Sequence, residues 1–156
     1  GHTVIVVDGE PCSCGRKGCW EAYASATGLI RQTRRAMEAH PDSKMWELAG
    51  GDLDQVNGRT AFDAMRQGDE TGKAVVDTYI RYIACGLVNM INIFQPEVLC
   101  VGGGICNEGE TLMKPLREYI ERERYSQNSA KQTQICVAQL GNDAGIIGAA
   151  YLGYQK

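Results

Sequence analysis

Residues 2–21 read HTVIVVDGEPCSCGRKGCWE, and this stretch decides how the rest of the chain is interpreted. It holds one histidine and three cysteines in the spacing His-x9-Cys-x-Cys-x4-Cys: His2, Cys12, Cys14 and Cys19. Three thiolates and one imidazole complete the ligand set of a structural zinc ion and leave no position for a catalytic water. The pattern therefore predicts a zinc site. The alternative is a chance cluster of reduced cysteines beside a surface histidine, but core packing hardly explains CxC-x4-C with two glycines.

Length and composition limit the classes of protein that fit. The 156 residues are enough for one domain with its own core. Hydrophobic residues make up 44% and charged residues 22%, as in a globular protein. The net charge of −3 disfavours a nucleic-acid surface, and no apolar run approaches the roughly 18 residues of a membrane span, which disfavours a membrane protein.

The cysteine count and the first residues bear on location and on chain boundaries. An odd count of seven cysteines with CxC spacing, and no signal peptide at the start, favour a reducing cytoplasmic location with metal-bound and free thiols. The chain begins with Gly1-His2 rather than an initiator methionine. We therefore expect it to be cut from a larger protein.

The remaining pattern alternates between helical and extended stretches. The order predicts an α/β fold with a mostly parallel sheet near the C-terminus. Three further cysteines, at 85, 100 and 136, fall in apolar patterns and are expected in the core, whereas Cys106 is left undetermined. The expected strands are 3–7, 98–101 and 135–140, and the expected helices are 20–40 with a break at Gly28, one turn at 45–49, 60–67, about 71–94, 108–124 and 144–152.

A glycine triplet follows the second expected strand. Gly102, Gly103 and Gly104 would let a nucleotide approach the backbone closely, but spacing alone favours a tight strand-to-helix turn. No Lys-Ser/Thr pair follows, so this is not a Walker A loop. Asn142-Asp143 gives an N-cap signal for the last helix.

Several motifs, in order along the chain, resemble the ROK family of bacterial sugar kinases and sugar-responsive repressors. They are GH followed by CSCGRKGCWEAYAS, then SATGLI, which is similar to the glucokinase branch, then VGGGI and GNDAGIIGAA. The resemblance covers residues 1–156 as a single domain, the larger C-terminal domain of a ROK protein without its N-terminal domain. It implies the ribonuclease H-like, actin-like ATPase fold with an inserted zinc loop and helices.

The resemblance also implies roles for particular residues. His2, Cys12, Cys14 and Cys19 would bind zinc, His2 and Glu21 would contact the sugar, and Gly102, Gly103 and Gly104 would contact the adenosine of ATP. The residues alone favour a different role for Glu21, that of a helix N-terminal carboxylate stabilised by the helix dipole.

The leading expectation is the sugar- and nucleotide-binding domain of an ATP-dependent, glucokinase-like hexose kinase that phosphorylates the 6-hydroxyl. ATP would act with Mg²⁺ in the intact protein, which is expected to be a cytoplasmic homodimer without nucleic-acid or membrane partners. Because the family's phosphate loop and catalytic base have no counterpart after Gly1, the chain alone is expected to be inactive and to hold no catalytic residue. The alternatives are the sugar-sensing effector domain of a ROK transcriptional repressor and a zinc-stapled interaction domain without a ligand.

Overall fold

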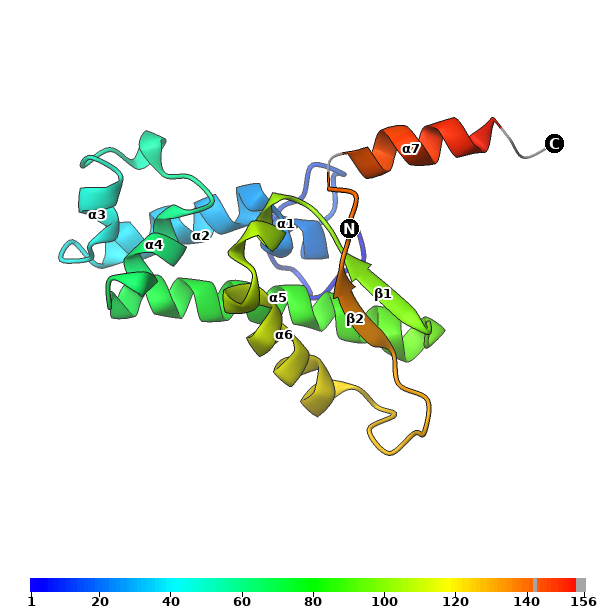
Figure 1. The fold of residues 1–156 in the computed structure, drawn as a ribbon. Helices are drawn as coiled ribbons and strands as arrows, with labels where there is room; N and C mark the ends of the chain where they lie inside the picture. Colours follow the sequence, from blue (N-terminus) through cyan, green and yellow to red (C-terminus); the bar gives the residue numbers. More distant parts are fainter. Residues whose placement is uncertain (142, 154–156) are drawn as a thin grey trace.

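The computed structural model describes residues 1–141 and 143–153, which form helices packed around one long helix and a small sheet at its side (Figure 1). The elements match most of the sequence-based predictions within a few residues. In chain order they are α1 (Trp20–Ala24), α2 (Ala26–Ala39), α3 (Met45–Leu48), the 3₁₀ turn η1 (Leu53–Gln55), α4 (Thr60–Arg66), α5 (Glu70–Phe94), β1 (Val98–Val101), the 3₁₀ turn η2 (Gly104–Glu108), α6 (Glu110–Glu123), β2 (Gln134–Val137) and α7 (Asp143–Leu152).

The central element is α5, with 25 residues. Asp69 caps its start, because Oδ1 accepts a hydrogen bond of 2.6 Å from the backbone N–H of Gly72. The helix ends where Gln95 adopts a left-handed conformation with φ of 42°, and Pro96 follows. Apolar residues that recur at helical spacing between Val75 and Ile91 form the buried face of this helix.

By length and composition α5 could cross a membrane, since its mean hydropathy over an 18-residue window is 1.3. The expectation that no segment reaches this length and hydropathy is therefore wrong for α5. However, 56% of that window is buried inside the protein. Its apolar residues pack in the core of the described part of the chain, and the core helix of a globular domain passes the same test.

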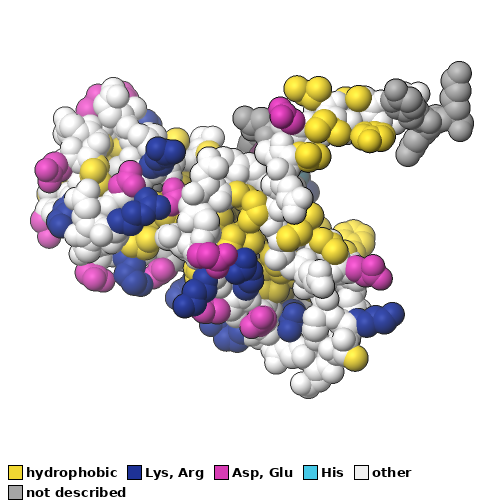
Figure 2. Space-filling model, viewed as in Figure 1, with side chains coloured by type: hydrophobic (Ala, Val, Ile, Leu, Met, Phe, Trp, Pro, Cys, Tyr) yellow, Lys and Arg dark blue, Asp and Glu magenta, His cyan; other side chains and the backbone are white. Residues whose placement is uncertain are grey.

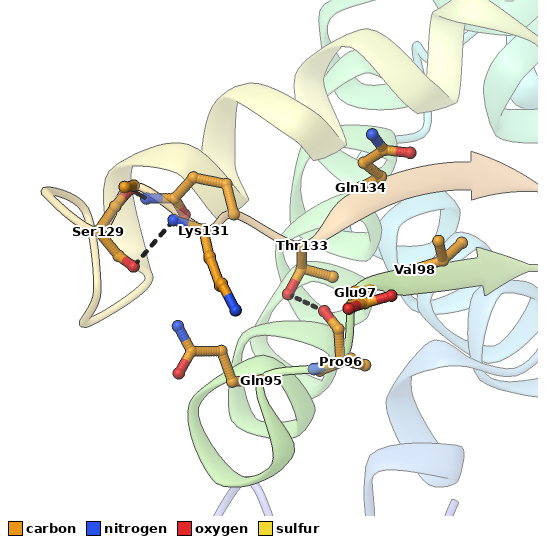
Figure 3. A pocket seen from close by; sticks show the side chains of 10 residues that line it. Gln95, Pro96, Glu97, Val98, Ser129, Lys131, Thr133 and Gln134 are labelled. Carbon is orange, nitrogen blue, oxygen red and sulfur yellow. Dashed lines mark hydrogen bonds between the residues drawn. The ribbon is translucent and has the colours of Figure 1, made fainter.

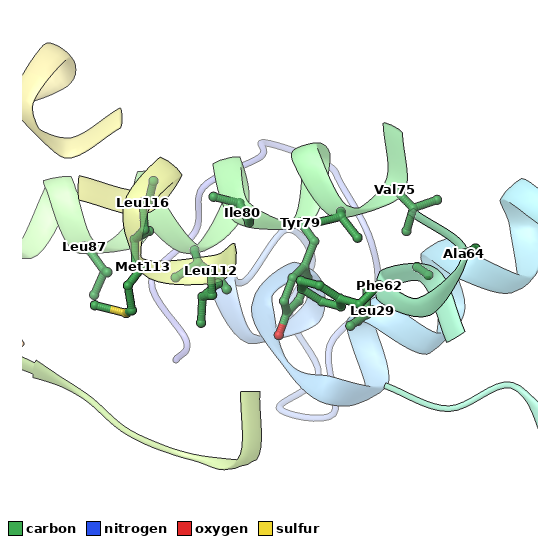
Figure 4. Close-up of a cluster of buried hydrophobic side chains, with 14 of the residues drawn as sticks. Leu29, Phe62, Ala64, Val75, Tyr79, Ile80, Leu87, Leu112, Met113 and Leu116 are labelled. Carbon is green, nitrogen blue, oxygen red and sulfur yellow. The ribbon is translucent and has the colours of Figure 1, made fainter. Parts of the chain in front are cut away.

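The core lies where α5 meets α2, α4 and α6. Figure 4 shows Phe62 of α4 and Tyr79 of α5 packed beside Leu29 of α2. In the same view, Leu112 and Leu116 of α6 pack against α5. All five side chains are at most 1% exposed. These helices bury their stripes against one another, which is why each forms as the periodicity predicts.

The sheet contains two parallel strands, and Val98 pairs with Gln134 at one end and Val101 with Val137 at the other. One face, with Leu99 and Ile135, packs on the core. The other face is open. The residues of β1 therefore alternate between exposed and half-buried. The expected core position of Cys100 is wrong, because Cys100 is exposed, whereas Cys85 and Cys136 are half-buried.

Two predictions near the N-terminus are also wrong. Residues 3–7 are not a strand, because the described chain pairs there only through the isolated bridge between Val4 and Cys19. The helical segment breaks at Ser25 and not at Gly28. Ser25 caps α2 by accepting a hydrogen bond from the N–H of Gly28, and a Cβ on Gly28 would lie 2.9 Å from the carbonyl carbon of Tyr23.

The last helix, α7, stands away from the rest of the protein (Figures 1 and 2). Figure 2 shows apolar side chains along this helix with no protein over them on the visible face. Ile146 is 73% exposed and Leu152 is 74% exposed. Asn142, proposed as the N-cap, lies outside the described residues.

Candidate functional site

The cysteine loop, residues 2–19, owes its shape to glycines and backbone hydrogen bonds. Gly15 and Gly18 have φ of 85° and 74°, and a Cβ on Gly18 would lie 1.6 Å from the carbonyl oxygen of Val6. The N–H of Cys12 donates to the carbonyl of Arg16 at 2.9 Å, which closes the turn that contains Cys14. The loop therefore returns the chain toward its own start.

The four predicted metal ligands do come together. The ligand atoms of His2, Cys12, Cys14 and Cys19 all lie within 4.8 Å of one another. His2 Nδ1 is 3.5 Å from Cys12 Sγ, and the sulfurs of Cys14 and Cys19 are 3.6 Å apart. In a tetrahedral zinc site the sulfur–nitrogen and sulfur–sulfur edges are about 3.6 and 3.8 Å. The donor set and its spacing therefore fit zinc.

The surroundings of the thiols differ. The backbone N–H of Arg16 lowers the pKa of the Cys14 thiol, whereas burial raises the pKa of Cys19 to about 11. Cys19 is fully buried. The Arg16 guanidinium donates a hydrogen bond of 3.3 Å to the carbonyl oxygen of His2, which places a positive charge beside the thiol cluster.

The two residues predicted to contact the sugar, His2 and Glu21, also lie together. Glu21 Oε2 is 3.5 Å from His2 Nδ1, and both side chains are about half exposed, at 46% and 52%. The N–H of Glu21 donates to the carbonyl of Gly1 at 2.8 Å, which holds the first turn of α1 against the chain start. Glu21 borders a cavity of about 240 Å³ whose lining also includes Cys12, Ser25 and Arg31.

Ser25 and Arg31 were missed by sequence reasoning. Arg31 is placed by tertiary contacts: its guanidinium donates to the carbonyl of Ala22 and lies 3.5 Å from Glu10 Oε2. Ser25 carries an N-cap signal, because a serine preceding a helical pattern is typical of this position.

The glycine turn forms at the carboxyl end of β1, where Gly103 has φ of 101°. Gly102, Gly103 and Gly104 line two cavities, of about 290 and 410 Å³. The larger cavity also includes Ser25, Arg59 and Tyr79. Ser25 thus lines both the cavity at Glu21 and the cavity at the glycine turn. The two predicted ligand sites therefore meet at the corner between α1 and α2.

A further polar cavity of about 730 Å³ lies at the other end of the strands, between the end of α5 and the segment before β2 (Figure 3). Its lining residues are partly engaged with one another. The hydroxyl of Thr133 donates to the carbonyl of Pro96 at 2.6 Å, and the N–H of Lys131 donates to Ser129 Oγ at 3.2 Å. Parallel sheets bind ligands at the carboxyl ends of their strands, so this cavity at the amino ends is the weaker candidate.

Curated glucokinases are similar to nearly the whole of this chain. A glucokinase from Streptomyces coelicolor is 37% identical over 157 residues, which cover 97% of this chain and 49% of the relative. A glucokinase from Thermotoga maritima is 38% identical over 151 residues, covering 96% of this chain and 47% of the relative. The chain thus spans about half the length of these curated relatives.

Solved structures of ROK proteins are also similar to this chain. A ROK family glucokinase from Streptomyces griseus, solved in complex with glucose and AMPPNP, superposes with a TM-score of 0.86 at 35% identity, over 100% of this chain and 51% of that one. The α/β arrangement is that of ROK sugar kinases, which have the actin-like ATPase fold. The family model described as "ROK family" matches residues 1–156, and the chain belongs to this family.

Proposed function

We propose that the chain is the C-terminal, sugar- and nucleotide-binding domain of an ATP-dependent hexose kinase of the glucokinase type, which transfers phosphate to the 6-hydroxyl. One observation carries the proposal: the cavity at Glu21 and the cavity at the glycine turn share Ser25. Phosphoryl transfer needs the acceptor hydroxyl and the terminal phosphate in adjoining sites, because positioning supplies much of the catalysis. The glucokinase relatives support the same reaction.

The sugar would be held by His2 and Glu21. His2 directs Nδ1 toward the thiols, so with Nδ1 as a metal ligand its other nitrogen carries the proton and can donate to a sugar hydroxyl. The Glu21 carboxylate can accept hydrogen bonds from neighbouring hydroxyls. A structural Zn²⁺ on His2, Cys12, Cys14 and Cys19 would fix the loop and the tautomer of His2.

The nucleotide would lie over Gly102, Gly103 and Gly104, where the absence of side chains leaves the backbone open to adenosine. Mg²⁺ would accompany ATP in the intact protein. We assign no catalytic base for the sugar hydroxyl to this chain, and we therefore propose that the chain alone is inactive. We further propose a cytoplasmic location and a homodimer, for which sedimentation of the purified chain is the test.

The zinc assignment is tested by metal analysis of reduced protein purified without chelator. We expect one zinc per chain in the wild type and loss of zinc in Cys14→Ser. Cys85→Ser is the matched control, because Cys85 lies on α5 outside the ligand set, and it should keep the metal. Wild-type protein without zinc would overturn the assignment.

Ligand binding is tested by the fluorescence of Trp20, which adjoins Glu21. Replacing Trp46, the second of the two tryptophans, by Phe isolates this signal. We expect saturable changes with glucose and with AMPPNP. Glu21→Gln should weaken glucose binding about 10- to 100-fold, since one charged hydrogen bond contributes about 1.5–3 kcal/mol. Glu38→Gln, an exposed change on α2, should leave binding unchanged.

The outcomes separate the functional classes. Binding of both ligands without ADP release in the presence of glucose and ATP supports the kinase domain. Glucose binding without AMPPNP binding favours the effector domain of a repressor. Binding of neither ligand contradicts both. ADP release well above the blank would contradict the proposed inactivity of the chain alone.

A further inference from the structure

Two cysteines outside the cysteine loop lie next to each other on the neighbouring strands of the sheet. Cys100 of β1 and Cys136 of β2 are register partners in the parallel pair. Their sulfurs are 3.1 Å apart, closer than any sulfur pair reported above for the cysteine loop. Neither thiol lines the cavities at Glu21 or at the glycine turn. The pair thus lies outside the cavities proposed to bind sugar and nucleotide.

Both thiols lie on the open face of the sheet. Cys100 is exposed and Cys136 is half-buried, whereas Leu99 and Ile135, one residue before each, pack on the core. Adjacent strands lie about 4.7–4.9 Å apart, which is within the Cα separation of about 4.4–6.8 Å that a disulfide spans. A bond between them can therefore form without moving the strands apart or changing their register.

We propose that Cys100 and Cys136 are a redox modification site, a dithiol that a hydroperoxide oxidises to a disulfide. The Cys100 thiolate attacks a peroxide oxygen, the O–O bond breaks, and the leaving oxygen takes up a proton. With hydrogen peroxide, this gives a sulfenic acid on Cys100 and one water. The Cys136 sulfur then attacks the Cys100 sulfur, and its proton leaves with the hydroxyl as a second water. The two thiols lose two electrons, and the peroxide gains them.

The geometry assigns the order of attack. Cys100 is the more exposed sulfur, so it meets the oxidant first. The hydrogen bond with Cys100 raises the pKa of Cys136, as burial also does, so Cys136 is the thiol that keeps its proton until the second step. The glycine turn begins at Gly102, two residues after Cys100. A disulfide between Cys100 and Cys136 would therefore link the strand that leads into this turn to β2.

The test is peptide mapping of the 156-residue chain before and after treatment with hydrogen peroxide, with alkylation of free thiols under denaturing conditions. Trypsin places Cys136 alone in residues 132–156, and Cys100 in residues 82–117 together with Cys85 and Cys106. We expect peroxide to link these two peptides and dithiothreitol to release them. The cysteines of the cysteine loop lie in other tryptic peptides, so their oxidation is measured separately.

Single variants assign the bond within the longer peptide. Cys100→Ser and Cys136→Ser should lose the link, whereas Cys85→Ser and Cys106→Ser should keep it. Circular dichroism confirms that each variant is folded, and the wild-type map stands without any variant. The proposal is overturned if both thiols are alkylated fully after peroxide treatment, or if Cys136 links equally well in Cys100→Ser. Either failure leaves the ligand-binding results unaffected and so is distinguishable from failure of the proposed function.

Discussion

The cysteine loop and the helical core around α5 are held by different physics. The core buries side chains such as Phe62, Tyr79 and Leu112 almost completely, and burial of each contributes about 1.5–3 kcal/mol. In the cysteine loop only Gly18 and Cys19 are buried. The loop depends on glycine turns, on backbone hydrogen bonds and on the cluster of the four side chains proposed as metal ligands. His2 and Glu21, the residues proposed to bind the sugar, therefore lie in or directly after a loop with much less apolar burial than the core.

The two regions meet at α1. The indole of Trp20 lies on Gly86 of α5, and its Nε1–H donates to the carbonyl of Tyr82 at 2.8 Å. The ring centroids of Tyr23 and Tyr82 are 4.5 Å apart, and the Tyr23 hydroxyl accepts a hydrogen bond of 2.7 Å from the backbone N–H of Glu10. Glu21 lies between Trp20 and Tyr23 in sequence, so these contacts fix it to the core. This contrast between the regions can be tested by changes in the core, at the junction and at the helix cap.

The largest effect is expected in the core. Phe62→Ala removes a ring that is fully buried on α4, and we expect the free energy of unfolding to fall by about 3–5 kcal/mol. Phe94→Ala is the matched control, because Phe94 is 71% exposed, and it should change stability by less than about 0.5 kcal/mol. Urea unfolding followed by circular dichroism measures both. Equal effects of the two changes would contradict the assignment of the core to this helix junction.

A smaller effect is expected at the junction. A Cβ on Gly86 would lie 2.0 Å from Cε2 of Trp20, so Gly86→Ala must displace the indole. We expect a loss of about 1–3 kcal/mol from the overpacking, a red shift of Trp20 fluorescence and weaker glucose binding. Gly148→Ala on α7, where a Cβ meets nothing within 4 Å, should have none of these effects. An unshifted Trp20 spectrum in Gly86→Ala would show that the loop does not depend on this contact.

Sequence reasoning succeeded where the determining signals are local. The helix expected at about 71–94 is α5, and the residues that set its bounds, Asp69 at its start and Pro96 after its end, lie next to it in the chain. The cysteine spacing likewise indicated the cluster that the structure brings together. The binding of zinc at this cluster, of sugar at His2 and Glu21, and of nucleotide at the glycine turn stays a prediction.

Sequence-based prediction failed where the structure of a segment depends on another segment that packs against it. Thr3–Val7 has the β-branched composition of a strand but lacks a neighbouring strand among the described residues, so its pattern alone could not form one. The exposure of Cys100 depends on what covers the second face of the sheet, which VLCV does not encode. Ser25 and Arg31 reach the candidate sites only because the chain turns between α1 and α2.

The smallest expected effect on stability is that of replacing Asp69, the carboxylate that caps the N-terminus of α5. Burial would raise the pKa of Asp69, but hydrogen bonds from the N–H groups of Gly72 and Lys44 and from the Ser43 hydroxyl outweigh it and lower the pKa overall. Asp69→Asn should cost about 1–2 kcal/mol at neutral pH, since an amide cannot accept on both sides. Asp77→Asn, which loses only an exposed ion pair with Lys73, should cost less than about 0.5 kcal/mol.

The pH dependence gives this prediction its sign. A carboxyl whose pKa is lowered by folding stabilises the protein fully above its unfolded value of about 3.9, and that contribution is lost as the pH falls through the folded value. The gap between wild type and Asp69→Asn should therefore be constant from about pH 6 to 8 and shrink below about pH 4. Urea unfolding at each pH measures it. A gap that does not shrink in acid would mean that the Asp69 charge contributes nothing and that apolar burial alone holds the helices around α5.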